Sequence, residues 1–171
     1  MDPIDVLKLD HTCVCVRDLD QAAVLYGDLL GGKLMSWYEP ETGAFATATF
    51  RYPNGSHIEL MEPIGRDSFA RKFLDKHGEG VHHLTFIVAD IHKAVAQARA
   101  GGYTVVSESY SRPEWMEAFI SPRSANGTVL QLTQTNVSLE VLANGVLAGD
   151  PDEARARRKI RRERERALGI I

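Results

Sequence analysis

Apolar side chains occupy every second position at Val14 and Val16 within residues 9–16, and at Leu84, Phe86 and Val88 within residues 81–88, and each stretch precedes a segment whose apolar residues recur at helical spacing. A spacing of two residues is typical of a strand with one face against the core, whereas a spacing of three and four residues indicates an amphipathic helix. The pattern therefore predicts a strand over 9–16 followed by a helix over 18–30. It predicts the same succession again, with a strand over 81–88 and a helix over 91–100.

Residues suited to begin and end helices flank both predicted helices. Asp18 and Asp90 precede them and are good N-caps, and the glycine pairs at 31–32 and 101–102 follow them. Three strand-like stretches come after each helix, and Asn-Gly turns at 54–55 and 126–127 lead into the last of them. Each half of the chain is expected to read strand, helix and three strands.

A constant step of 72 residues relates the two halves. Residues 54–60 read Asn-Gly-Ser-His-Ile-Glu-Leu and residues 126–132 read Asn-Gly-Thr-Val-Leu-Gln-Leu, and the same step carries His11 onto His83. A single step that links distant segments indicates a duplicated module. We expect one two-module domain over 1–135, with modules at about 7–63 and 79–135, a linker at 64–78 and an extension at 136–171.

The helix of each module needs an apolar sheet face to cover, and this requirement sets the orientation of the strands. Ile58 and Leu60 share one face of the last strand in the first module, as Leu130 and Leu132 do in the second. Ligand-type side chains are thereby directed to the uncovered faces. These are His11, Glu59, His83 and Gln131.

The same four residues predict a metal site. A lone histidine in a strand is usually structural and a lone glutamate is usually solvated, but four ligand-type residues in repeat-related positions favour metal binding. The fold class expected is α+β, with two half-barrels that direct the four side chains into one cleft.

Composition indicates an ordinary globular chain. The 171 residues are 44% hydrophobic and 25% charged, enough to bury a core. No apolar run is long enough to span a membrane and no basic leader precedes an apolar stretch, so we expect a cytoplasmic protein without a membrane partner. Cys13 and Cys15 are too close along a strand for an easy disulfide. A cluster of His11 with both cysteines is a weaker alternative than packing of the cysteines in the cavity wall.

The C-terminal segment differs in charge from the rest. Eight basic and five acidic residues lie between Asp150 and Ile171, which leaves +3 there and −6 in residues 1–149 of a chain whose net charge is −3. Asp150 is a suitable N-cap for a basic helix over 151–168. We interpret this helix as solvated or in contact with another subunit. Nucleic acid is a disfavoured partner, because Glu163 and Glu165 interrupt the basic run and aromatic residues are lacking.

Four stretches carry a family resemblance: Leu9-Asp10-His11, residues 58–68, residues 72–74, and Gly78-Glu79-Gly80-Val81-His82-His83. Over residues 7–135 the chain resembles the vicinal oxygen chelate superfamily of glyoxalase I, extradiol dioxygenases, bleomycin-resistance proteins and methylmalonyl-CoA epimerases, and most of all the epimerases. The resemblance implies paired βαβββ modules that form an open barrel around a divalent metal. Its ligands would be His11, Glu59, His83 and Gln131; the 72-residue step selects His83 over His82.

The implied ligand set suits one six-coordinate divalent ion. Two imidazoles, one carboxylate and one amide oxygen are compatible with Co²⁺, Mn²⁺, Ni²⁺ or Zn²⁺, and intrinsic affinities do not decide among them. The resemblance implies a small-molecule partner, an acyl thioester such as a CoA ester or another carbonyl substrate. The metal would stabilise an enolate after proton abstraction next to the carbonyl. A homodimer is expected.

Gln131 departs from the epimerase pattern, which usually has a glutamate there. An amide does not accept a proton at neutral pH, so the residue cannot act as a base. The candidate catalytic residues are therefore Glu59, as ligand and base, and Glu41, a loop acid that would supply the second base. Otherwise Glu59 acts alone and the reaction is not a two-base epimerisation.

Two other functions stay open. One is a glyoxalase-like lyase acting on another carbonyl substrate, which Gln131 favours; an Fe(II) dioxygenase is weaker, because that group has its glutamate at this position. The other is a non-catalytic protein that binds an aromatic or antibiotic ligand in a cleft lined by Trp37 and Trp115. The residues Tyr38 and Met116 would also line such a cleft or fill the core. Trp115 replaces a small, glycine-rich segment of the epimerases, which suggests a different or larger substrate.

Overall fold

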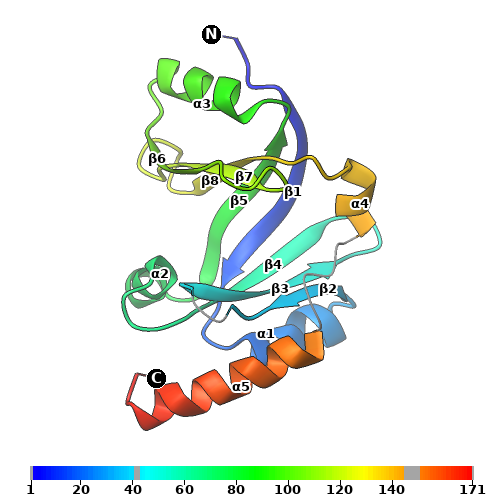
Figure 1. Ribbon diagram of the computed structural model, residues 1–171, viewed down its shortest axis with the longest axis vertical. Helices are drawn as coiled ribbons and strands as arrows, with labels where there is room; N and C mark the ends of the chain where they lie inside the picture. Colours follow the sequence, from blue (N-terminus) through cyan, green and yellow to red (C-terminus); the bar gives the residue numbers. More distant parts are fainter. Residues whose placement is uncertain (1, 41–42, 145–150, 171) are drawn as a thin grey trace. The chain divides into compact units, whose positions relative to one another are not determined.

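The computed structural model describes residues 2–40, 43–144 and 151–170, which form an α+β fold (Figure 1). Eight strands make one mixed sheet that is not closed, in the order β2-β3-β4-β1-β5-β8-β7-β6. The strands are β1 (Val6–Cys15), β2 (Lys33–Tyr38), β3 (Phe45–Arg51), β4 (His57–Pro63), β5 (Gly80–Val88), β6 (Val105–Ser109), β7 (Met116–Ile120) and β8 (Val129–Gln134). The helices are α1 (Leu19–Ala23), the π-helix η1 (Val24–Leu29), α2 (Phe69–His77), α3 (Ile91–Ala100), α4 (Leu139–Asn144) and α5 (Pro151–Ala167).

The predicted succession of a strand, a helix and three strands is confirmed in both halves. Helix α3 has the predicted bounds, and Asp90 caps it by accepting a hydrogen bond from the backbone nitrogen of Lys93 at 3.0 Å. Asp18 likewise caps α1, accepting from the backbone nitrogens of Asp20 and Gln21. The sequence was sufficient to predict where these two helices begin, because an N-cap residue interacts only with the first turn of its own helix.

The helix after Asp18 differs from the prediction in its second half. The α-helix ends at Ala23 and continues as the π-helix η1, in which the backbone nitrogen of Leu30 bonds to the carbonyl of Leu25 at 3.0 Å. Gly27 lies in this segment, and a Cβ atom added there would be 2.9 Å from the Phe50 ring. The glycine therefore allows the wider turn to approach β3 closely.

Two helices lie outside the predicted set. Residues 64–78, expected only as a linker, contain α2, which Ser68 caps by accepting from the backbone nitrogen of Arg71 at 3.1 Å. Helix α4 follows β8. No helix of the described residues is long and apolar enough to cross a membrane.

The chain divides into two compact units, and the first comprises Met1–Cys13 and Val81–Leu142. Helix α3 covers one face of strands β5, β7 and β8 in this unit (Figure 1). Its core consists of Val88, Ile91, Ala94, Val95, Ala98, Ala118, Ile120, Ala125 and Leu132. As predicted, Phe86 and Leu130 face the helix, so the other sheet face is left for polar side chains.

The second unit comprises Val14–Gly80 and Ala143–Ile171. Helices α1 and α5 lie on the same face of strands β2, β3 and β4 (Figure 1). The buried core consists of Val14, Val16, Leu19, Trp37, Ala46, Ala48, Phe50, Leu60 and Ala154. Ala154 comes from α5, which is therefore an integral layer of this unit.

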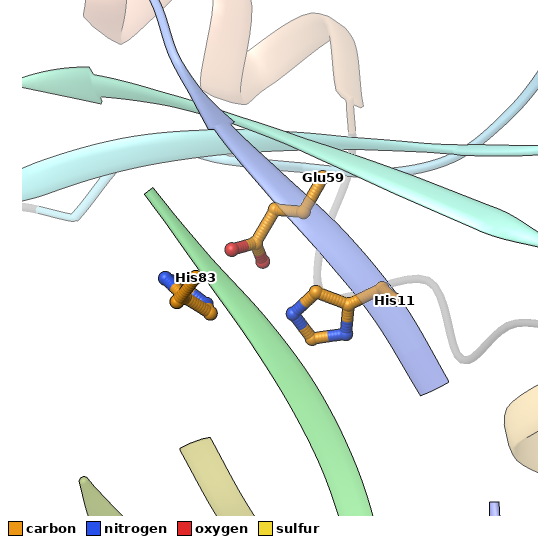
Figure 2. A group of neighbouring side chains, drawn as sticks. All are labelled: His11, Glu59 and His83. Atoms are coloured by element: carbon orange, nitrogen blue, oxygen red, sulfur yellow. The ribbon is translucent and has the colours of Figure 1, made fainter. Parts of the chain in front are cut away.

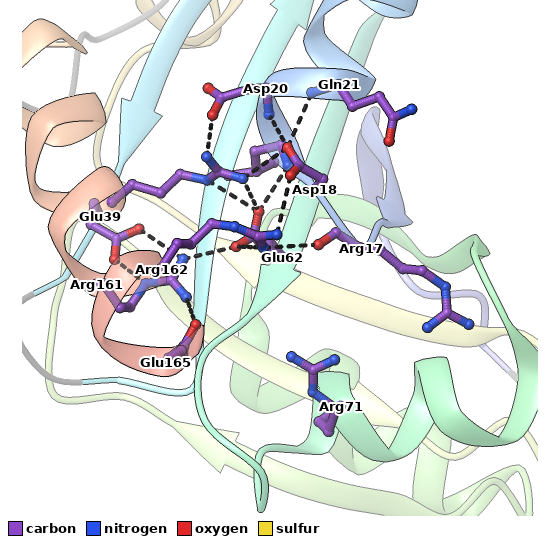
Figure 3. A network of polar contacts seen from close by, with 12 residues as sticks. Arg17, Asp18, Asp20, Gln21, Glu39, Glu62, Arg71, Arg161, Arg162 and Glu165 are labelled. Carbon is purple, nitrogen blue, oxygen red and sulfur yellow. Dashed lines mark hydrogen bonds and ion pairs between the residues drawn. The ribbon is translucent and has the colours of Figure 1, made fainter. Parts of the chain in front are cut away.

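Helix α5 corrects the interpretation of the C-terminal segment. A helix is present as predicted, while its proposed cap Asp150 lies outside the described residues. The prediction of a solvated helix is wrong for one face, because the exposed fractions of Ala154 and Arg158 are 2% and 3%. Arg158 is buried because acidic groups of the same unit surround its guanidinium: Glu62 at 2.5 Å, Asp18 at 3.0 Å and Asp20 (Figure 3).

Glu62 on β4 is the centre of this ion network (Figure 3). Its carboxylate is 1% exposed and also contacts Arg161 and Arg162, each at 2.9 Å. Burial alone would raise the pKa of Glu62, but the arginines, led by Arg158, lower it overall. Three cations from one helix thus keep a buried carboxylate ionised, and the carboxylate in turn holds the helix on the sheet.

Candidate metal centre and active site

The uncovered sheet face of the first unit is lined by buried polar side chains. His11, His83, Thr85 and Gln131 have exposed fractions of 8%, 6%, 0% and 5%. Strand alternation places them there, since Leu84 and Phe86 take the opposite side of β5. The parallel pairing of β5 with β8 sets Thr85 beside Gln131. A buried polar face requires partners for its donors and acceptors.

Hydrogen bonds connect three of the predicted site residues. The Thr85 hydroxyl is 2.9 Å from Nε2 of His11 and donates to Oε1 of Gln131 at 2.7 Å. The rings of His11 and His83 meet edge to face with their centroids 5.8 Å apart, and Figure 2 shows both imidazoles. The structure thus brings His11, His83 and Gln131 together within one unit.

Asp10 orients His11, although it was absent from the predicted site. Its Oδ2 lies 2.9 Å from Nδ1 of His11, and Lys8 contacts Oδ1 at 2.9 Å. Burial would raise the pKa of Asp10, but the hydrogen bonds from His11 and Lys8 outweigh it and lower the pKa to about 2. A carboxylate on one ring nitrogen directs the other nitrogen of a histidine toward a metal. In the sequence, this role of Asp10 could have been inferred from its position directly before His11.

Burial favours the neutral form of the His83 imidazole. Burial, with smaller effects from His11 and His82, lowers its pKa to about 3, and burial lowers that of His82 to about 4. The Nδ1 atoms of His82 and His83 are 2.8 Å apart. A metal ligand must be deprotonated, so a buried histidine that stays neutral suits that role at neutral pH.

Two further groups on this face were missed by sequence reasoning. Nε2 of Gln131 donates to Oε2 of Glu117 on β7 at 2.7 Å. The hydroxyl of Thr133 is fully buried and has no hydrogen-bond partner within the part of the chain that the structure describes. An unsatisfied buried hydroxyl indicates a place for a polar ligand or water. Two imidazoles, an amide oxygen and an unsatisfied hydroxyl on one face fit a centre that holds a divalent ion and a polar substrate.

Glu59 belongs to the second unit. It lies on β4 opposite Thr49 of β3, is half-buried, and alternates with Ile58 and Leu60 as predicted. Figure 2 draws its carboxylate together with the two histidines. The other proposed catalytic acid, Glu41, lies outside the described residues.

Trp37 and the two cysteines are buried in the structure. Trp37 is 1% exposed in the core of the second unit, and it also lines a cavity of about 480 Å³ there that contains none of the candidate ligands. Cys13 and Cys15 are buried and are not joined in a disulfide. The Cys15 thiol donates to the carbonyl of Ala70 at 3.6 Å, and burial raises its pKa to about 12. The sulfur of Cys15 is thus directed to the Ala70 carbonyl, which disfavours a cluster of His11 with the cysteines.

An apolar cavity of about 560 Å³ opens on the opposite side of the first unit, beneath α3. Its lining includes Leu84, Phe86, Leu130 and Leu132, the residues that face the helix. The cavity contains none of the candidate ligands and is therefore separate from the polar face.

Comparison with known proteins identifies the class. Residues 10–119 match the Glyoxalase/Bleomycin resistance protein/Dioxygenase superfamily, and the chain belongs to this superfamily. Its relatives include the ethylmalonyl-CoA/methylmalonyl-CoA epimerase of Cereibacter sphaeroides, 30% identical over 135 residues, with 74% of this chain and 97% of the relative covered. A lactoylglutathione lyase of Haemophilus influenzae is 29% identical over 106 residues, with 60% and 74% covered.

Solved structures agree with this assignment and confirm the α+β fold. Methylmalonyl-CoA epimerase from Mycobacterium tuberculosis matches with a TM-score of 0.71 and 28% identity, covering 82% of this chain and 96% of that one. A variant of the Streptomyces coelicolor epimerase in complex with 2-nitronate-propionyl-CoA matches with a TM-score of 0.68 and 26% identity, covering 78% and 97%. The predicted likeness to methylmalonyl-CoA epimerases is confirmed.

Proposed function

We propose that the protein is a divalent-metal-dependent epimerase that abstracts the proton next to the carbonyl of a CoA thioester. The observation that carries this proposal is the buried polar face of the first unit, on which His11, His83 and Gln131 lie together around the Thr85 hydroxyl. The 72-residue step that carries His11 onto His83 and Glu59 onto Gln131 supports the same function, as does the similarity of the whole chain to epimerases.

The proposed metal ligands are His11, Glu59, His83 and Gln131. When bound, a divalent ion supplies Lewis-acid stabilisation of the negative charge that develops on the carbonyl oxygen. The donor set of nitrogen and oxygen atoms suits Co²⁺, Mn²⁺, Ni²⁺ or Zn²⁺.

The protein's own groups perform the remaining tasks. Asp10 fixes the ring of His11, and burial keeps His83 neutral so that its nitrogen lone pair is available. The Thr85 hydroxyl holds the amide oxygen of Gln131 at 2.7 Å. Glu59 is the proposed base: its carboxylate takes the proton from the carbon next to the thioester carbonyl.

Metal analysis tests the ligand set. Protein freed of metal by a chelator and reloaded is expected to hold one divalent ion per chain, and His83→Ala is expected to lose it, because a neutral buried nitrogen is removed. The matched control is His92→Ala, an exposed histidine on α3 that should keep the ion. Retention of the metal by His83→Ala, or its absence from the wild-type protein, would contradict the proposal.

Isotope exchange tests the reaction. Methylmalonyl-CoA incubated with the metal-loaded protein in deuterated water should exchange its α-hydrogen and lose stereochemical purity, because protonation occurs on either face of the enolate. Exchange without inversion would indicate a one-base enzyme. If neither occurs, the protein is not an epimerase of this substrate.

A glyoxalase-like lyase is the second candidate. The lactoylglutathione lyase relative and the amide at Gln131 favour it. Conversion of a glutathione hemithioacetal by the metal-loaded protein, with no exchange on acyl-CoA, would establish this reaction in place of epimerisation.

A further inference from the structure

Gln131 leaves the first unit without the carboxylate that epimerases usually carry at this position, yet a carboxylate lies on the neighbouring strand. Strands β7 and β8 pair antiparallel with Phe119 opposite Gln131 and Glu117 opposite Thr133. Residues opposite one another project from the same sheet face. Glu117 therefore shares the polar face with Gln131, diagonally across the strand pair.

The contact between the two side chains is direct. Gln131 directs Oε1 to the Thr85 hydroxyl at 2.7 Å and Nε2 to Oε2 of Glu117 at 2.7 Å. The Gln131 amide therefore lies between the Thr85 hydroxyl, on the side of the histidines, and the Glu117 carboxylate, and it forms a hydrogen bond with each. Glu117 is half-buried, and no cation forms an ion pair with it among the residues that the structure describes.

A second observation indicates that this corner receives a ligand. Thr133, directly opposite Glu117, has a fully buried hydroxyl that lacks a partner in the described parts of the chain. Phe119 contacts His83 edge to face, with centroids 6.3 Å apart, and closes the apolar side of the corner. An ionisable carboxylate, a free hydroxyl and an aromatic wall together suit a polar substrate group with an apolar neighbour.

We propose that Glu117 is the second proton-transfer group of the reaction. The inference rests on the proposed epimerase function. One carboxylate, Glu59, removes the α-hydrogen as a proton, so a C–H bond breaks and an enolate forms. The carboxyl group of Glu117 delivers a proton to the other face of that carbon, a new C–H bond forms, and Glu117 becomes a carboxylate. Exchange of protons with water restores both carboxyl groups, and the reverse reaction exchanges their roles.

The proposal also accounts for the amide at Gln131. A glutamate there would set two carboxyl groups in contact, and two such groups cannot both ionise without a cost. With glutamine in this position, one carboxylate remains on the face and the amide donates a hydrogen bond to it.

The decisive variant is Glu117→Gln. A glutamine still offers an oxygen to Nε2 of Gln131, so the orientation of that amide is retained, but it neither takes nor delivers a proton. The matched control is Glu114→Gln, the same chemical change at an exposed position of the same segment. Both variants are assayed in deuterated water for inversion and for α-hydrogen exchange starting from each epimer, and metal content is measured in parallel.

For Glu117→Gln we expect epimerisation to fall by about 100-fold or more, within the range for loss of a general acid or base. One epimer should still exchange its α-hydrogen with retention of configuration, because Glu59 remains, and the metal content should equal that of the wild type. Glu114→Gln should match the wild type in every measurement. A purely orienting role of Glu117 would leave Glu117→Gln active.

The outcomes separate the two proposals. If the wild type epimerises and Glu117→Gln does so at the same rate, the role of Glu117 is overturned while the proposed function stands. A Glu117→Gln protein that loses exchange from both epimers, or loses its metal, also overturns this role. If the wild type exchanges no α-hydrogen at all, both proposals fail.

Discussion

The chemistry of His83 depends on its burial. The pKa of its imidazole falls from 6.5 to about 3, chiefly because burial disfavours the charged form, and that of His82 falls to about 4 for the same reason. Below pH 6.5 these histidines therefore bind protons in the unfolded chain but remain neutral in the folded chain. The stability contributed by the neutral histidines is fully present above pH 6.5 and is lost progressively as the pH falls toward their folded-state values.

This shift predicts acid sensitivity in the metal-free protein. The free energy of unfolding should decrease between about pH 6.5 and about pH 5, and each histidine contributes up to about 1.4 kcal/mol per pH unit. His83→Gln should show a shallower decrease, whereas His92→Gln, at an exposed position, should keep the wild-type slope. Urea denaturation in the presence of a chelator measures both slopes; equal slopes for His83→Gln and the wild type would contradict the assignment.

The sequence predicted some site residues and not others for a clear reason. His11 and His83 followed from the repeat, because equivalent positions in duplicated strands share a face. Glu117 did not, because the 72-residue step carries it onto Phe45 and leaves no repeat signal. Its role depends on the register of β7 against β8, which only the folded structure supplies.

Among the elements, helix α5 shows why a local sequence pattern predicts a helix but not the surface against which that helix packs. Its alanine and arginine content was sufficient to predict a helix, and the same arginines made the helix look solvated. Their partners, Glu62 and Asp18, lie about a hundred residues or more earlier in the chain. The π-helix η1 was missed for a related reason, since Gly27 contacts Phe50 on another element.

The buried ion network predicts which arginines of α5 matter. Arg158→Met should destabilise the protein by about 3 kcal/mol, because it leaves Glu62 and its acidic neighbours with one cation fewer in a buried site. Arg164→Met, at an exposed position of the same helix, should change stability by less than about 0.5 kcal/mol. Chemical denaturation compares the two, and equal effects would show that α5 is held by other contacts.

For the whole molecule, the charge asymmetry of the sequence is resolved inside the chain. The C-terminal segment carries +3 against −6 for residues 1–149, and three of its arginines, Arg158, Arg161 and Arg162, contact acidic groups of the second unit. Neither water nor another subunit is needed to neutralise these buried contacts. Strand β1 contributes residues up to Cys13 to one compact unit and Val14 and Cys15 to the other, a division that the 72-residue repeat does not indicate.

Removal of residues 151–171 is therefore expected to destabilise one unit selectively. The truncated chain loses Ala154 from the core of the second unit and leaves Glu62 buried without its three arginines, a cost of several kcal/mol. Amide hydrogen exchange should then accelerate in β2, β3 and β4, while α3 and β8 of the first unit keep more of their protection. A Glu62→Leu substitution in the truncated chain should recover part of the loss, because it removes the unpaired buried charge. Uniform loss of protection in both units, or no loss in β2–β4, would show that α5 does not support the second unit in this way.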